Sequence, residues 1–274
     1  MMNTRFKKTQ WLKASPAFLF SLLAMMPSNL EAQDRVRVRE GTSLDQPVLD
    51  LFNSQEFKLA FAESYKSETD IEPKVDEEEL LSLQAVLELI SDDQLDQASV
   101  NILGMMDRNE VDSPVFDFTL GNMYVQSDQL DETAVHYKAA VEKFPNYRRA
   151  WKNLGIIHIR KSNFEEAIPA LTKVLELGET TSIIYGLLGY AYSSTGNFLS
   201  AESAYRNAIM LDPDTLDWKM GLARSFFKQD RFSEAISLTK LLLSEDSENA
   251  DLWLLQANAY IGLEKPMEAA EIYE

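Results

Sequence analysis

The sequence predicts an all-α fold of about five tandem helix-turn-helix copies that stack into a right-handed superhelix. Three observations support this prediction. Columns of like residues recur every 34 positions from about residue 80. Small residues and large apolar residues hold fixed places within each copy. Prolines close alternate copies, at Pro145 and Pro213. A period of this length is the signature of a solenoid, because one copy cannot bury its own apolar face.

The repeat is visible as several columns of residues. One column pairs a leucine with a small residue: Leu120-Gly121, Leu154-Gly155, Leu188-Gly189 and Leu222-Ala223. A ring column contains Tyr124, His158, Tyr192, Phe226 and Tyr260, and a column of mostly small residues contains Thr133, Ala167, Ala201, Ala235 and Ala269. A further aromatic column contains Trp151, Tyr185 and Trp253, with Asp117 and Lys219 in its gaps. Trp218, one residue before Lys219, is expected to supply the missing ring.

This pattern resembles the tetratricopeptide repeat family, whose 34-residue motif is W-x2-L-G-x2-Y followed by A, an aromatic residue, A and P. The best copy is Ser182–Thr215, with Tyr185, Leu188-Gly189, Tyr192, Ala201, Tyr205, Ala208 and Pro213. The resemblance covers about 195 of the 274 residues. It implies a protein-binding solenoid but gives almost no information on the identity of the partner.

Each residue type that recurs in the columns has a physical role, which the best copy illustrates. Gly189 and Ala201 are expected where the two helices of the copy cross, and a larger side chain there would cost about 1–3 kcal/mol. Gly196 is expected in the turn between the helices. Pro213 ends the second helix because proline cannot continue it. Glu202, next to Ala201, is expected on the surface.

We divide the chain into three regions on these grounds. Residues 1–32 are a predicted signal peptide, and residues 33–79 are a predicted linker with a short helix. The repeat domain is residues 80–274, with copies at 80–113 (degenerate), 114–147, 148–181, 182–215, 216–249 and 250–274 (incomplete).

The first 32 residues have the pattern of an export signal. Arg5, Lys7, Lys8 and Lys13 precede a ten-residue apolar run at 17–26. That run is too short to span a membrane, which needs about 20 residues. We expect cleavage after Ala32 and a periplasmic or secreted protein, the alternative being an uncleaved N-terminal anchor or a misassigned start. A lipoprotein is excluded because the chain has no cysteine.

The predicted linker contains one helix signal and one acidic stretch. Asn53 and Glu56 resemble a capping box ahead of Phe57. This helix either docks on the repeat domain as structure or binds a partner. The stretch from Glu63 to Glu79 is acidic and is expected to be solvated.

Composition excludes several function classes. There are 26 Lys+Arg against 44 Asp+Glu, a formal charge of −18, which disfavours nucleic-acid binding. The chain has no cysteine and two histidines. We interpret His158 as a core residue and His136 as a surface residue. No catalytic, cofactor or metal motif is recognised, so we expect no catalytic residues, no cofactor and no bound metal.

The resemblance places the ligand site on the concave side, which is lined by positions 2, 5, 6, 9, 12 and 13 of each first helix. The residues carried over are Asn122, Arg149, Lys152, Asn153, Arg160, Tyr190, Arg224, Phe227, Lys228 and Asn258. The acidic residues at these positions are Asp217 and Asp251, so the face is basic on an acidic chain. We therefore expect a protein or peptide partner, bound in extended form and acidic. The alternative is a solvated face without a ligand.

Some members of the family clamp the terminal carboxylate of chaperone tails. Only Asn122 and Asn153 match that clamp, whereas Phe118, Ile183 and Leu187 depart from it. We reject that ligand. The sequence favours a non-catalytic protein–protein interaction scaffold in an exported compartment. The alternatives are a helper or regulatory portion of a longer enzyme or transport system, and a stand-alone enzyme.

The last residues of the chain are apolar. Ile272-Tyr273 would leave open surface at the end of the solenoid. We expect a longer open reading frame, or a partner or a dimer that covers this end.

Overall fold

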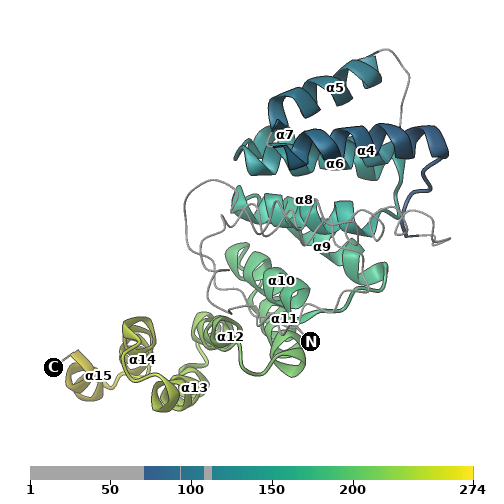
Figure 1. Ribbon diagram of the computed structural model, residues 1–274. Helices are drawn as coiled ribbons and strands as arrows, with labels where there is room; N and C mark the ends of the chain where they lie inside the picture. Colours follow the sequence, from purple (N-terminus) through teal and green to yellow (C-terminus); the bar gives the residue numbers. More distant parts are fainter. Residues whose placement is uncertain (1–70, 93, 108–112, 274) are drawn as a thin grey trace, which may run out of the picture. The chain divides into compact units, whose positions relative to one another are not determined.

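The computed structural model of the chain describes residues 71–92, 94–107 and 113–273, and every regular element in these ranges is an α-helix (Figure 1). The predicted signal peptide and the predicted helix near Asn53 lie outside the described residues. The described residues separate into two compact units, an N-terminal unit that ends at Asn153 and a C-terminal unit that begins at Leu154. The helices are α4 (Glu77–Ser91), α5 (Leu95–Asp107), α6 (Pro114–Gln126), α7 (Leu130–Lys143), α8 (Arg148–Arg160), α9 (Phe164–Glu176), α10 (Ser182–Ser194), α11 (Phe198–Leu211), α12 (Leu216–Lys228), α13 (Phe232–Glu245), α14 (Ala250–Gly262) and α15 (Pro266–Tyr273).

The helices alternate as first and second members of pairs, which confirms the predicted all-α repeat class. The first helices α6, α8, α10, α12 and α14 begin 34 residues apart, at Pro114, Arg148, Ser182, Leu216 and Ala250. Helix α4 begins at Glu77, three residues earlier than the sequence predicts. The reason is a capping box, in which Asp76 accepts from the Glu79 N–H at 2.8 Å and Glu79 accepts from the Asp76 N–H at 3.0 Å.

Each first helix from α6 onward ends in the same way. The turn residue is left-handed at 34-residue intervals, and the following N–H bonds the carbonyl five residues back, as in Asn197 to Tyr192 at 2.8 Å. This is the Schellman cap. Only one of these turn residues is glycine. The others carry a side chain at a cost of roughly 1–2 kcal/mol each; the set is Asp128, Ser162, Gly196, Asp230 and Glu264.

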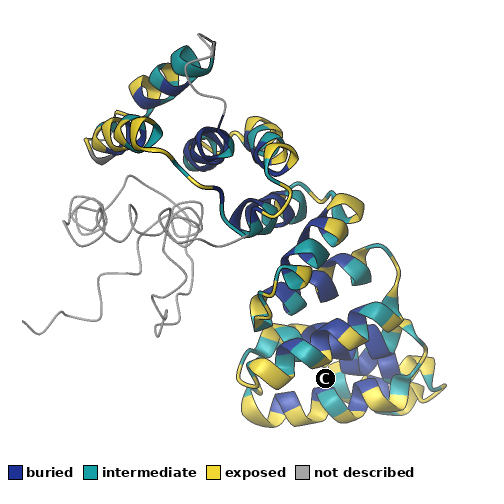
Figure 2. Ribbon diagram, turned by 90° about the vertical axis from the view of Figure 1, so that its right-hand side faces the viewer, coloured by how far each residue is buried: buried dark blue, intermediate teal, exposed yellow. Residues whose placement is uncertain are grey.

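Tyr205 of α11 is the wedge of the C-terminal unit. Its ring lies against two glycines: a Cβ on Gly189 of α10 would come within 2.8 Å of the ring, and one on Gly221 of α12 within 2.3 Å. Ala201, one turn earlier on α11, is fully buried. Figure 2 shows that packed helices turn their buried residues toward neighbouring helices and carry exposed residues on their outer faces. Glycine is therefore required where the tyrosine ring passes.

The prediction that Glu202 is exposed is wrong. Its side chain is 14% exposed and forms ion pairs with Arg206 of its own helix and with Arg231, which precedes α13. Burial raises the pKa of Glu202, but hydrogen bonds from Arg206 and Gln229 outweigh it, so the pKa lies below its ordinary value. Glu202 therefore helps to join α11 to the next pair.

The prediction that His136 is a surface residue is also wrong. Its Nδ1 lies 3.1 Å from Oδ1 of the buried Asp117, and its ring stacks on Tyr124 at 5.4 Å. The other carboxylate oxygen of Asp117 lies 2.8 Å from Nζ of Lys143. A charged cluster therefore fills the place where this copy lacks an aromatic residue.

The Trp218 side chain packs on α10 of the preceding copy. A Cβ added to Gly186 of α10 would come within 2.4 Å of its ring. Lys219 occupies the aromatic column, and its Nζ lies 3.7 Å from the Glu245 carboxylate.

Candidate functional site

The two asparagines predicted to bind a peptide backbone are buried in the N-terminal unit. The Tyr137 hydroxyl donates to Oδ1 of Asn122 at 2.6 Å. The Asn153 amide donates to the Tyr137 hydroxyl at 3.2 Å and to the same Asn122 oxygen at 3.3 Å. Asn122 is 1% exposed. In this arrangement the asparagines hold α6, α7 and α8 together rather than facing a ligand, so their predicted role in binding stays untested.

Arg149 of α8 is also interior, with 8% exposure. Its Nε donates to Oε2 of Glu72 at 2.8 Å. The guanidinium also lies over the rings of Phe118 and Tyr147, 5.7 and 5.9 Å from their centroids. A carboxylate of the same chain thus occupies the position where an acidic ligand was expected. Lys152, one turn further along α8, is half-buried.

The C-terminal unit presents the other predicted residues more openly. Its first helices α10, α12 and α14 contact one another in order. Tyr190 is 48% exposed, and Leu254 and Ile261 are about half exposed. The polar residues are also accessible: Arg160, Arg224 and Lys228 are exposed, and Phe227 and Asn258 are half-buried. We call the exposed and half-buried residues at the predicted ligand-facing positions of α10, α12 and α14, together with Arg160 at the end of α8, the inner face of the C-terminal unit.

The pKa of Tyr205 is governed mainly by burial, with smaller influences from Arg224, Tyr190 and Asp217. Burial raises the pKa of Tyr205 above its ordinary value, so the hydroxyl remains neutral at physiological pH. Arg224 is also paired with Asp251, Nη2 to Oδ2 at 3.4 Å. Because Arg149 and Lys152 lie in the N-terminal unit, the basic residues left at the predicted ligand-facing positions of the C-terminal unit are Arg160, Arg224 and Lys228, against Asp217 and Asp251.

The sequence reasoning missed both tyrosine hydroxyls. Tyr137 and Tyr205 occupy the same place in copies 114–147 and 182–215. Each contacts the glycine of the first helix in its own copy, Gly121 or Gly189. We treated Tyr205 as a core aromatic residue only. The sequence does contain an indication of this role. The two tyrosines occupy the same repeat position, and the hydroxyl of a buried tyrosine usually has a polar partner.

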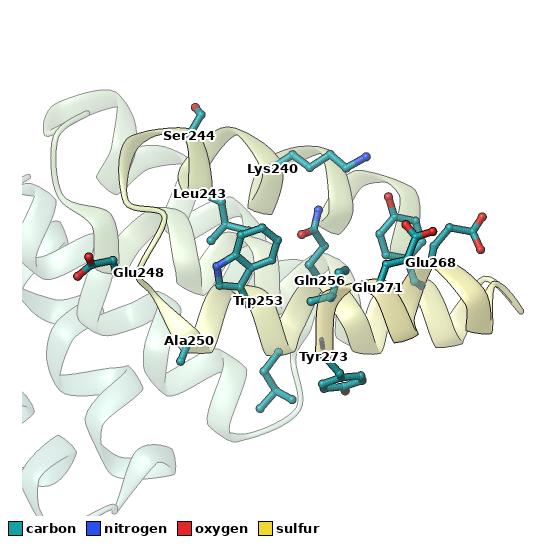
Figure 3. Close-up of a pocket in the computed structure, with 13 residues that line it drawn as sticks. Lys240, Leu243, Ser244, Glu248, Ala250, Trp253, Gln256, Glu268, Glu271 and Tyr273 are labelled. Carbon is teal, nitrogen blue, oxygen red and sulfur yellow. The ribbon is translucent and has the colours of Figure 1, made fainter.

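A separate hollow of about 1050 Å³ lies at the C-terminal end of the C-terminal unit, among α13, α14 and α15 (Figure 3). Trp253 lies on its wall and donates its indole N–H to the Ser247 carbonyl at 2.8 Å. Tyr273 also lines it and is 58% exposed. The expectation that a partner or a dimer covers this end stays a prediction.

Two further features bear on function. Among the described residues no three His, Asp or Glu side chains are grouped to hold a metal ion. In the same part of the chain, no helix combines the length and the hydropathy needed to cross a bilayer.

Comparison with known families agrees with the repeat. Sequence models described as "Tetratricopeptide repeat" match residues 118–180 and residues 193–259. The matched segments fall on α6–α9 and on α10–α14. Each unit therefore contains matched sequence.

Individual relatives are distant. The chain is 32% identical over 102 residues to "Tetratricopeptide repeat protein 30 homolog" of Aedes aegypti, which covers 37% of this chain and 15% of that protein. The chain thus spans a small part of that relative's length. A tetratricopeptide repeat protein from Parabacteroides merdae is similar in structure, with a TM-score of 0.56, 15% identity, and coverage of 70% of this chain and 75% of that one. The protein YrrB, described as having an unusual peptide-binding site, has a TM-score of 0.54 at 18% identity, covering 62% and 88%.

Proposed function

This chain is a tetratricopeptide repeat protein, and on that premise we propose that it binds an extended peptide on the inner face of its C-terminal unit. Proteins of this family are protein–protein interaction scaffolds and are generally non-catalytic. A scaffold needs an accessible surface with a regular set of contacts. The inner face defined above meets that requirement.

The observation that carries this proposal is the exposure of apolar side chains on the first helices α10 and α14, with the half-buried Phe227 on α12 between them. Tyr190 of α10 and Leu254 and Ile261 of α14 are each about half exposed. Apolar side chains gathered on one surface are typical of interaction sites. Packed helices lie about 8–10 Å apart, and an extended chain rises about 3.3 Å per residue. A peptide lying across the helices would therefore meet a new helix about every third residue.

We further propose that the peptide carries acidic groups, because exposed basic residues accompany the apolar contacts. Lys228 and Arg160 are exposed in the C-terminal unit, while Arg224 is shared with Asp251. Exposed ion pairs contribute only about 0.2–1 kcal/mol each. Most of the affinity must then come from apolar contacts such as Phe227, with charge setting the rate and the specificity.

The test uses the double variant Arg160→Glu with Lys228→Glu. A labelled acidic peptide and its copy with every Glu changed to Gln are titrated against the wild-type chain at low and physiological salt. We expect the acidic peptide to bind more tightly, the difference to shrink as salt rises, and the double variant to lose it with unchanged helicity. The matched control is Lys138→Glu with Lys265→Glu, which makes the same charge change at exposed positions elsewhere. If both double variants lose the same affinity for the acidic peptide, the effect is due to net charge alone and the proposed site is wrong.

We also propose that the chain is exported, on the grounds of its basic start and the short apolar run at 17–26. Mass spectrometry of the native protein is expected to find a mature N-terminus near Gln33. Recovery of the intact N-terminus from the cytosol would contradict export.

A further inference from the structure

We propose that Arg149 forms a carboxylate-binding site in the N-terminal unit, that its resident ligand is the chain's own segment at residues 71–76, and that an acidic peptide must displace this segment to bind there. The site is separate from the inner face of the C-terminal unit, and the proposal does not depend on the function inferred above.

The guanidinium is built into the unit before any ligand is considered. Arg149 is more than nine-tenths buried, and the rings of Phe118 and Tyr147 hold it by cation–π contact. Arginine in such a position presents donors in a fixed fork that matches a carboxylate. The Glu72 carboxylate accepts from Nε at 2.8 Å.

The segment around Glu72 is held as a peptide ligand is held, by a side-chain contact, a main-chain contact and the burial of an apolar residue. The carboxylate meets Arg149, and the carbonyl of Ile71 accepts from the Arg148 N–H at the start of α8, at 3.2 Å. Pro73, the next residue, is buried. Residues 73–76 form no helix, and Asp76 has extended backbone angles of φ −77° and ψ 176°. Side chain, main chain and an apolar ring thus contribute together.

The electrostatic environment of the Glu72 carboxylate allows the segment to dissociate from Arg149. Burial raises the pKa of Glu72, whereas Arg149, Arg148 and Lys152 lower it, and the effect of burial prevails. The loss of hydration is therefore only partly offset by the basic groups. Docking is supported instead by the covalent connection, because the segment leads directly into α4 of the same unit, and a connected ligand has an effective concentration of about millimolar. A peptide in solution must compete with that concentration.

The experiment measures this competition with the full chain and a labelled synthetic peptide copying residues 67–79. The variant Glu72→Gln weakens the tethered ligand but leaves Arg149 intact, so we expect it to bind the peptide at least about tenfold more tightly than the wild type. The control Glu78→Gln removes an equal charge from an exposed position and is expected to bind as the wild type does. Adding Arg149→Gln to Glu72→Gln is expected to abolish binding.

A second measurement needs no variant and decides the case if Glu72→Gln fails to fold. Trypsin can cut after Lys74, which is exposed within the segment. An excess of the same peptide with Gln in place of its Lys74, which trypsin does not cut, is expected to accelerate this cut in the wild-type chain, since the peptide displaces the segment. This peptide with Gln also in place of Glu72 is expected to have no effect. The proposal is overturned if a folded Glu72→Gln variant binds no better than Glu78→Gln, or if saturating peptide leaves the cleavage rate unchanged.

Discussion

Replacing Tyr205 with Ala is expected to destabilise the C-terminal unit by about 3–5 kcal/mol, the range for truncating a large buried aromatic residue. Tyr205 is 4% exposed, and its ring fills the gap between Gly189 and Gly221. Neither glycine can extend a side chain into the space left behind. Urea unfolding followed by circular dichroism measures the loss.

The matched control is Tyr205→Phe, which keeps the ring and removes the hydroxyl. We expect a cost of about 1 kcal/mol or less, because the ring that packs between the two glycines is kept and only the hydroxyl is lost. Equal destabilisation by the Ala and Phe variants would show that the hydroxyl, and not the ring, is what the unit depends on. It would also contradict the role of Tyr205 as a packing wedge.

The helices could be predicted from the sequence because each column reports a local requirement that every copy meets again. Ala201 and Gly189 recur as small residues since the helices of each pair cross closely there. The turns were predicted only in part. Gly196 predicts a left-handed backbone conformation, but Asp230 and Glu264 adopt the same conformation although neither is a glycine. There the backbone geometry of the repeat overrides the preference of the residue.

The candidate site could be predicted only as a set of positions, not as a set of accessible groups. A position in the repeat says which way a residue points, but Asn122 and Asn153 are closed off by the Tyr137 hydroxyl, which comes from a different helix. Arg149 is occupied by Glu72, which lies 77 residues earlier and outside the repeat pattern.

Charged pairs within a copy were missed for a related reason. His136 and Asp117 are 19 residues apart and meet across two helices. Asp117 stands in an aromatic column, and a periodic pattern describes it only as a missing ring. The structure shows what replaces the ring: a carboxylate held between His136 and Lys143. Where a copy lacks the usual residue of a column, side chains from other repeat positions thus occupy the space.

Replacing Ala201 with Leu is expected to cost about 1–3 kcal/mol, because the added carbons enter a fully packed cluster that includes Leu222 and Phe226. Glu202 is unsuitable as the reference position, since its ion pairs join neighbouring repeats. The control is Ser203→Ala, at an exposed position on the same helix, where a change within about 0.5 kcal/mol is expected. Thermal unfolding of both variants gives the comparison. A melting temperature for the Ala201→Leu variant equal to that of the control would mean that the helices of this pair can separate without loss, and that the small-residue column does not set their distance.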